Sequence, residues 1–206
     1  MESNPLIYAH RGMWQTPDQQ NSRQSIEAAR SSGYGVETDF RSKSHSLVIS
    51  HDPYGDSNPL AVDAIDFAEI PVALNVKEDG LLTQYEAFIK KYPNQFTFIF
   101  DGSIPEMVKI KEKELPHALR LSEYEKDLPW ESQFLWVDGF YSDWWIKSPE
   151  ILNLIEKFFV VFASPEIHGR EIERAWDFFH FLHSKGIAKF GICTDHPDKL
   201  KAIFDE

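Results

Sequence analysis

Three apolar runs in the first quarter of the chain carry ionisable residues at or near their ends. His10 and Arg11 directly follow the first run, and His51 comes just after the third. Glu37 and Asp39 lie two positions apart in the second run, so both side chains point to the same side of a strand. If the runs are buried parallel strands, their carboxyl ends share one mouth of an α/β fold. This combination of groups suits a phosphate ester held against a metal ion.

The two histidines and the arginine have distinct roles in such a site. An imidazole has an unperturbed pKa of about 6.5, so one ring can accept a proton while another donates one near neutral pH. His10 and His51 are therefore the candidate catalytic acid and base. A guanidinium can donate two hydrogen bonds to a phosphate, which makes Arg11 a candidate phosphate ligand if the chain turns at Gly12. An ion pair between Arg11 and a barrel carboxylate is the structural alternative.

Glu37 and Asp39 are the candidate metal ligands. Two carboxylates that converge inside a barrel repel each other unless a cation or a proton lies between them, and hard divalent ions prefer oxygen ligands. The alternative interpretation is a network of salt bridges in which Arg11, Arg41 or Lys77 neutralises the two acids. The neighbouring histidines favour the metal ion.

Strand-like and helix-like segments alternate along the chain. Eight strands of the parallel type are expected at residues 6–9, 35–40, 72–76, 96–100, 118–121, 134–137, 158–163 and 190–194, with an additional strand at 47–50. Amphipathic helices lie between them, as over residues 172–182, where apolar residues recur at i, i+3, i+4 and i+7 and Gly186 is placed as a C-terminal cap. This alternation predicts a compact α/β protein, a single (β/α)8 TIM-type barrel over residues 1–206.

The length of the chain constrains this barrel. A chain of 206 residues is at the short end for the fold, so some helices must be short or missing. Weak periodicity makes residues 102–115 and 123–133 the candidates for loops in place of helices. The alternative architecture is an open doubly wound sheet, which would leave Asp195 far from His10.

Two helix starts can be proposed from local sequence. Asn21 with Gln24 resembles a capping box, in which a side chain at each position satisfies a free backbone N–H group. Ser148 followed by Pro149 resembles an N-cap with proline in the first helical position. Both motifs predict helices that begin directly after them.

Composition narrows the possible partners and location. The formal net charge of −12 argues against nucleic acid, whose binding depends on Lys and Arg that neutralise phosphates. The single cysteine, Cys193, cannot form an internal disulfide and is interpreted as a core residue. The N-terminal residues lack the basic and apolar regions of a secretory leader, and no apolar stretch approaches the roughly 20 residues needed to cross a bilayer. We therefore expect a cytoplasmic protein without membrane insertion.

Several of these motifs resemble those of the glycerophosphodiester phosphodiesterases, relatives of the phosphatidylinositol-specific phospholipases C. The resemblance is carried by His-Arg-Gly at residues 10–12, Glu-x-Asp at 37–39, His-Asp at 51–52, a strand ending in Lys at 74–77 and Thr-Asp-x-Pro at 194–197. It is strong over residues 6–53 and sparse afterwards.

The resemblance implies a function and a set of roles. It implies a TIM barrel that hydrolyses a small phosphodiester of a glycerol-like or polyol alcohol in lipid metabolism, with Mg²⁺ or Ca²⁺ as cofactor. It assigns acid and base roles to His10 and His51. It also implies that Arg11 and Lys77 bind the phosphate and that the metal is held by four acidic positions.

Two of those four positions are amides in this chain. Gln20 and Asn75 stand where the family has glutamates, while Glu37 and Asp39 are retained. Amide oxygens can coordinate Mg²⁺ or Ca²⁺ but bring no charge, so metal binding should be weakened. Asp101 is the preferred substitute, because its strand should lie beside the strand of Asn75. Other acids on the same lip are Glu123, Asp138, Glu166 and Asp195.

The second half of the chain offers a further candidate subsite. His168 and Arg170 follow an apolar strand and are predicted to hold a second anionic group of the substrate. Trp144 and Trp145 lie on another expected upper loop, where they could shape the pocket, although packing is the commoner role for such pairs. Two functional alternatives stay open: a lyase that releases a cyclic phosphate, and a non-catalytic barrel that binds a phosphorylated ligand at a decayed metal site.

Overall fold

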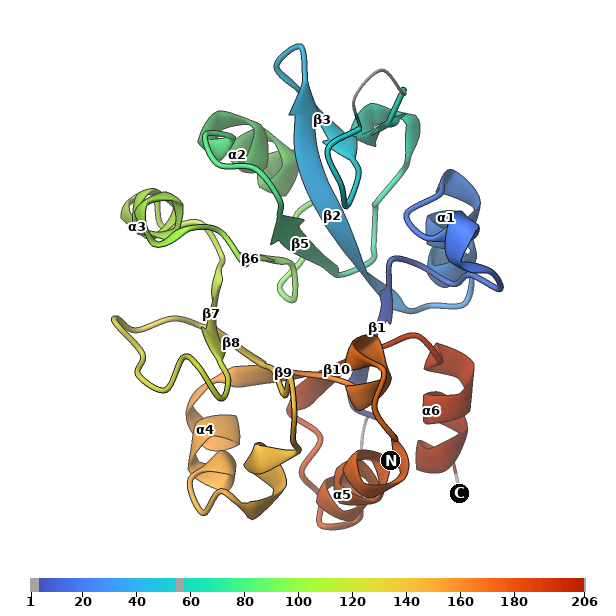
Figure 1. Cartoon of the computed structure of the whole chain (residues 1–206), viewed down its shortest axis with the longest axis vertical. Coiled ribbons are helices and arrows are strands. Elements are labelled where there is room, and N and C mark those ends of the chain that lie inside the picture. The colour runs from blue at the N-terminus through green and yellow to red at the C-terminus, as the bar shows by residue number, and fades with distance from the viewer. Residues whose placement is uncertain (1–3, 55–57, 206) are drawn as a thin grey trace.

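Eight parallel strands form a ring in the computed structural model, which describes residues 4–54 and 58–205 (Figure 1). The strands are β1 (Leu6–His10), β2 (Gly35–Lys43), β5 (Val72–Val76), β6 (Phe98–Phe100), β7 (Ala118–Leu121), β8 (Phe134–Val137), β9 (Phe159–Ala163) and β10 (Phe190–Thr194). Neighbours pair in the order β6-β5-β2-β1-β10-β9-β8-β7. A single bridge between Ile99 and His117 joins β6 to β7, and the Ile99 amide donates to the Pro116 carbonyl at 3.0 Å. The predicted (β/α)8 barrel is confirmed.

Strand β2 continues beyond the ring as an arm (Figure 1). It pairs antiparallel with β3 (Ser46–Ile49), which pairs antiparallel with the short β4 (Leu60–Ala61). Ser44 and His45 join β2 to β3 with φ values of 50° and 67°, the positive pair that a tight hairpin turn requires. The expected additional strand is confirmed, and it carries the chain back towards the barrel mouth at residue 50.

Six helices cover the outside of the ring within the described ranges (Figure 1). They are α1 (Arg23–Ser31), α2 (Leu82–Lys91), α3 (Ile104–Glu112), α4 (Ile151–Lys157), α5 (Glu173–Ser184) and α6 (Pro197–Phe204). The arm and a 3-10 turn at Val62–Ala64 replace a helix after β2, and residues 123–133 form no helix after β7. The expectation of a missing helix was wrong at 102–115, because Ser103 caps α3 by accepting from the Glu106 amide. No described helix has the length and apolar character needed to span a bilayer.

The two proposed helix starts were displaced by one or two residues. Ser22, rather than Asn21, caps α1, and its hydroxyl oxygen accepts from the Ser25 amide at 3.0 Å. The first residue of α4 is Ile151, and the Ser148 hydroxyl oxygen accepts from the Glu150 amide in the turn before the helix. In both cases the correct residue type lies nearby, but several candidates compete within one turn and local sequence does not choose among them.

The barrel interior is filled mainly by aromatic side chains. Phe98 stacks on Phe134 with ring centroids 4.9 Å apart, and Phe100 stacks on Trp136 at 4.2 Å. Cys193 is fully buried in the same cluster, as expected for a core residue. Such large rings fill the centre of the barrel, so the polar chemistry is confined to its rim.

Gly12 fixes how β1 passes into the loop before α1. Its φ is +84°, and a Cβ at this position would lie 2.6 Å from the backbone carbon of Ser25. Gly12→Ala should therefore lower the free energy of unfolding by about 2–3 kcal/mol, since it combines left-handed strain with a backbone clash. Urea denaturation monitored by tryptophan fluorescence measures this loss.

Gly33→Ala is the matched control for Gly12→Ala. Gly33 also has a positive φ, +78°, but nothing lies within 4 Å of the added Cβ. Gly33→Ala should lower the free energy of unfolding by only about 1 kcal/mol, from the left-handed backbone strain alone. Equal losses in the two variants would show that the close approach to Ser25 contributes nothing.

Candidate active site

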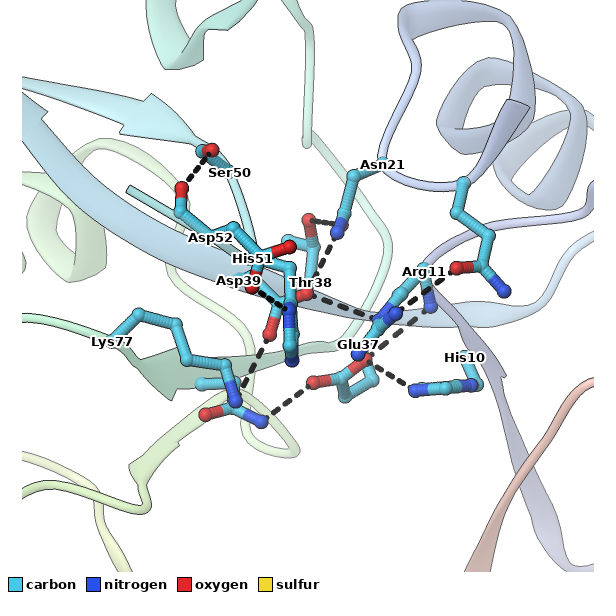
Figure 2. A network of polar contacts seen from close by, with 12 residues as sticks. His10, Arg11, Asn21, Glu37, Thr38, Asp39, Ser50, His51, Asp52 and Lys77 are labelled. Atoms are coloured by element: carbon cyan, nitrogen blue, oxygen red, sulfur yellow. Dashed lines mark hydrogen bonds and ion pairs between the residues drawn. The ribbon is translucent and has the colours of Figure 1, made fainter. Parts of the chain in front are cut away.

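The candidate site lies at the carboxyl ends of β1, β2 and β5 (Figure 2). The parallel register places His10 beside Glu37, and Asp39 beside Asn75. Lys77 follows β5 directly, and its amide donates to the Phe40 carbonyl at 3.1 Å. The structure thus brings together residues of three strands that together span more than sixty positions of the chain, as the motifs predicted.

His10 is held by an acid from the last barrel strand. Its Nδ1 atom lies 2.7 Å from Oδ1 of Asp195, and its Nε2 atom lies 3.9 Å from Oε2 of Glu37. Burial lowers the pKa of His10, but the hydrogen bond to Asp195 and the charges of Glu37 and Asp195 outweigh it, so the pKa is raised overall. Because a carboxylate only accepts, Nδ1 carries the proton and Nε2 is left for proton transfer. The barrel was expected to keep Asp195 from lying far from His10, but Asp195 was considered as a substitute metal ligand and its hydrogen bond to His10 was not predicted.

Asp39 is the centre of an ion-pair network. Its Oδ2 atom lies 3.1 Å from Nε of Arg11 and accepts from Nδ2 of Asn21 at 2.7 Å. Its Oδ1 atom lies 3.3 Å from Nζ of Lys77. Asn21 is fixed in turn by the hydroxyl of Thr38, which donates to its Oδ1 atom at 2.7 Å. The salt-bridge interpretation is therefore realised at Asp39, through Arg11 and Lys77.

Glu37 is buried and is paired with neither Arg nor Lys; His10 is its nearest ionisable partner, at 3.9 Å. Its Oε1 atom accepts from Nδ2 of Asn75 at 3.0 Å, and its Oε2 atom accepts from the Arg11 amide at 3.3 Å. Burial, followed by the charge of Asp39, raises the pKa of Glu37 to about 7, although His10, Asn75 and Lys77 act against this. Near neutral pH this carboxyl group is consequently poised between its charged and neutral forms.

The raised pKa values of Glu37 and His10 predict that the stability of the folded protein depends on pH. An ordinary glutamate has a pKa of 4.5, so between about 4.5 and 7 the folded protein holds a proton on Glu37 that the unfolded chain releases. Stability due to Glu37 should fall as the pH rises through that window. His10 acts in the same direction: its contribution is complete below 6.5 and is lost as the pH passes its raised pKa.

Urea denaturation at several pH values between about 4.5 and 8 tests this dependence. Glu37→Gln should show a shallower decline of unfolding free energy with pH than the wild type. Glu27→Gln, at an exposed helical position paired with Arg23, is the control and should keep the wild-type slope. A slope that Glu37→Gln leaves unchanged would contradict the assignment.

Arg11 turns into the site, as expected for a phosphate ligand. Its φ of 55° reverses the chain before Gly12, and its amide donates to the Glu37 carbonyl at 2.8 Å. The guanidinium reaches Asp39 through Nε and donates from Nη1 to Oε1 of Gln20 at 3.0 Å. Arg11 thus remains in contact with a barrel carboxylate while its outer N–H groups face the mouth.

His51 lies on the other side of Arg11 from His10 in the view of Figure 2. It follows β3 on the arm, is 44% exposed, and its Nδ1 atom lies 2.9 Å from Oδ1 of Asp52. His51 and Arg11 line one open cavity of about 490 Å³, together with Gln20 and Asn21. Like His10, His51 is therefore a histidine paired with an acid, but one reached from solvent.

The other predicted residues lie in separate contacts. Asp101 pairs with Arg120 at 3.1 Å, and burial raises its pKa despite that arginine. His168 lies 2.6 Å from Asp138, and Arg170 lies 2.8 Å from Asp143. Trp145 is fully buried in the core, in agreement with the packing role, and Trp144 donates to the Asp138 carbonyl. Arg120, His168 and Arg170 are therefore each already paired with an acid.

The residues present do not fit the divalent ion that the family resemblance implies. Among the residues that the structure describes, no group of three or more His, Cys, Asp or Glu side chains could hold a metal ion. The oxygens of Glu37, Asp39 and Gln20 all face N–H groups or cations of the protein. Of the expected ligands on these strands, Asn75 alone keeps a buried oxygen, Oδ1, with neither a hydrogen bond nor an ion pair. One neutral oxygen is far from the set of about six that Mg²⁺ or Ca²⁺ requires.

Comparison with known proteins places the fold. No family model and no curated protein sequence matches the chain. A glycerophosphodiester phosphodiesterase from Agrobacterium tumefaciens strain C58 is 15% identical with a TM-score of 0.70, over 98% of this chain and 100% of that one. A phosphodiesterase from Oleispira antarctica, solved with its product sn-glycerol-3-phosphate, is 15% identical with a TM-score of 0.63, over 98% of both chains. A glycerophosphoryl diester phosphodiesterase from Parabacteroides distasonis is 14% identical with a TM-score of 0.60, over 99% of this chain and 87% of that one.

The coverage shows that the likeness extends over the whole barrel. It includes the strands after residue 53, where the sequence motifs are sparse, and so it adds to what the motifs carry alone. At this level of identity the likeness concerns the fold. This chain has a barrel similar in fold to those of the glycerophosphodiester phosphodiesterases, the family that its motifs resemble.

Proposed function

We propose that the protein hydrolyses a small phosphodiester of a glycerol-like or polyol alcohol at the mouth formed by β1, β2 and β5. The observation that carries this proposal is the His10–Asp195 pair, which shares one mouth of the barrel with the partly exposed cations Arg11 and Lys77. A base with a fixed tautomer next to two cations can act on an anionic ester. The glycerol phosphate product held by the Oleispira antarctica relative supports a ligand of this class.

The chemistry follows from the two histidines. Nε2 of His10 takes the proton of a hydroxyl beside the phosphorus, and that oxygen attacks to form a cyclic diester. His51 donates a proton to the leaving alcohol, and the contact of its Nδ1 atom with Asp52 orients the ring. Water then opens the cyclic diester to a phosphomonoester with the two histidines in reversed roles. The sequence of proton transfers balances, and both rings return to their starting states.

A steady-state assay across a panel of glycerophosphodiesters tests this function. The assay is run with EDTA and with added Mg²⁺, Ca²⁺ or Mn²⁺, so that turnover is separated from metal dependence. Phosphorus NMR then identifies the product. A phosphomonoester supports hydrolysis, whereas a persistent cyclic diester identifies the lyase alternative.

A panel without turnover would refute the catalytic proposal. Calorimetry would then separate the remaining alternative from no function at this site. Binding of glycerol 3-phosphate without turnover is the result expected of a non-catalytic barrel, for which the poor fit to a metal ion is the motive.

A further inference from the structure

We infer that Arg11 and Lys77 supply the positive charge that binds the phosphoryl group, and that the site binds no divalent ion. This inference rests on the proposed function, whose phosphate ester defines the ligand. In this view, the side chains of Arg11 and Lys77 take the place of the expected metal ion.

N–H groups and cations of the protein already occupy the places next to Asp39 and Glu37 that a metal ion would take. Lys77 and Arg11 lie on the two different oxygens of Asp39, at 3.3 and 3.1 Å. The amide groups of Asn21 and Asn75 point N–H groups at Asp39 and Glu37. A metal ion would have to displace these donors from carboxylates that are almost completely buried, at 1% and 2% exposure.

The charges of the site also balance without a metal ion. Glu37 and Asp39 together carry two negative charges when ionised, and Arg11 and Lys77 carry two positive charges, so the set is neutral without a metal. A divalent ion would add two uncompensated positive charges to a buried network, where charges are poorly screened. Gln20 and Asn75 are neutral, so they cannot offset it.

Arg11 and Lys77 are both still able to reach a ligand. The side chains of Arg11 and Lys77 are 21% and 22% exposed, whereas Asp39 beneath them is 1% exposed. Asp39 therefore positions two cations at the rim, one on each of its carboxylate oxygens. Each keeps N–H groups that its contacts with Asp39 and Gln20 do not use, and these can donate to phosphoryl oxygens.

Metal binding is tested first, by calorimetric titration of MgCl₂, CaCl₂ or MnCl₂ into the wild type. No specific binding is expected at millimolar concentration. Gln20→Glu/Asn75→Glu adds two carboxylates beside Glu37 and Asp39 and should gain a metal site, with affinity at least about tenfold above the wild type. Gln133→Glu/Asn153→Glu carries the same added charge at exposed positions outside the site and should gain none.

Phosphoryl binding is tested second, by titrating inorganic phosphate and glycerol 3-phosphate into the wild type with EDTA and then with MgCl₂. Each ligand is expected to bind with the same affinity in EDTA and in MgCl₂. Lys77→Met should weaken binding by about 10- to 100-fold, the effect of one charge-assisted hydrogen bond, and Lys77→Arg should retain most of it. Thermal unfolding checks that each variant is folded, and the EDTA comparison needs no variant.

The outcomes separate this inference from the proposed function. Metal binding by the wild type, phosphate binding that requires the metal, or no phosphate binding at all would each overturn the inference. Metal-independent phosphate binding without turnover of any diester would leave the inference standing and overturn only the catalytic proposal.

Discussion

Replacement of His10 by alanine is expected to lower kcat for the preferred diester by about 10²- to 10⁴-fold, the usual contribution of a general base. His10 ends β1, and Asp195 fixes its Nδ1 atom, so the ring presents Nε2 to the mouth. The ring packs at the rim rather than in the aromatic core, so the fold should survive. Steady-state kinetics, with circular dichroism as a check of folding, measures the effect.

His51→Ala should cause a loss of similar size, since His51 carries the opposite proton transfer. His180→Ala, at an exposed position of α5, is the matched control and should keep the wild-type rate. The wild type should show a bell-shaped dependence of rate on pH, and each active-site variant should lose one limb. A wild-type rate in either variant would remove that histidine from the mechanism.

Asp195→Asn distinguishes a role in proton transfer from simple packing. The Asp195 carboxylate raises the pKa of His10, so removing its charge should move the acidic limb of the pH profile to lower pH. A purely structural role would reduce the rate at all pH values without moving the limb. Asp195 acts through His10 and is thus a positioning residue.

The fold was predictable from sequence because its signals are local. Most barrel strands are mainly apolar runs bounded by polar residues, and the predicted ranges agree with the observed strands to within three residues. Helix starts were less predictable, because Asn21 and Ser22 are both good caps and only the tertiary role of Asn21, its bond to Asp39, decides between them. Sequence position alone does not contain that choice.

The proximity of the candidate residues was predictable from sequence, but their side-chain pairing was only partly predictable. The motifs correctly gathered His10, Glu37, Asp39 and Lys77 at one mouth, because parallel strands end at the same rim. The partner of His10 is 185 positions away, and no local pattern indicates it. The choice between a metal and an ion pair at Asp39 likewise depended on where two long side chains point.

The side-chain partner of Asp101 was likewise not predictable from sequence. Asp101 was the preferred substitute ligand because β6 was expected beside β5, and that neighbourhood is confirmed. Its side chain nevertheless pairs with Arg120 on β7, a cation that the motif analysis did not consider. A strand neighbour fixes which residues are near, but the orientation of each side chain follows from the whole set of charges around it.

Removal of the Asp39 carboxylate is expected to be the most destabilising single change at the site. Asp39→Ala leaves Arg11 and Lys77 without their shared counter-ion and leaves the Asn21 amide without its acceptor. Breaking a buried ion pair costs about 3–5 kcal/mol, and the partial exposure of both cations places this case near the lower end, at about 3 kcal/mol. Urea denaturation at neutral pH measures the loss.

Asp63→Ala is the matched control, since Asp63 also pairs with a lysine, Lys91, at 3.0 Å but is 85% exposed. It should cost less than about 1 kcal/mol, because exposed ion pairs contribute little. Asp39→Ala/Lys77→Met should lose less than the sum of its single variants, since the second change removes a cation that the first left unpaired. A loss below about 1 kcal/mol for Asp39→Ala would mean that Arg11 and Lys77 do not depend on this carboxylate. The two cations would then lack the buried anchor that positions them for a phosphate.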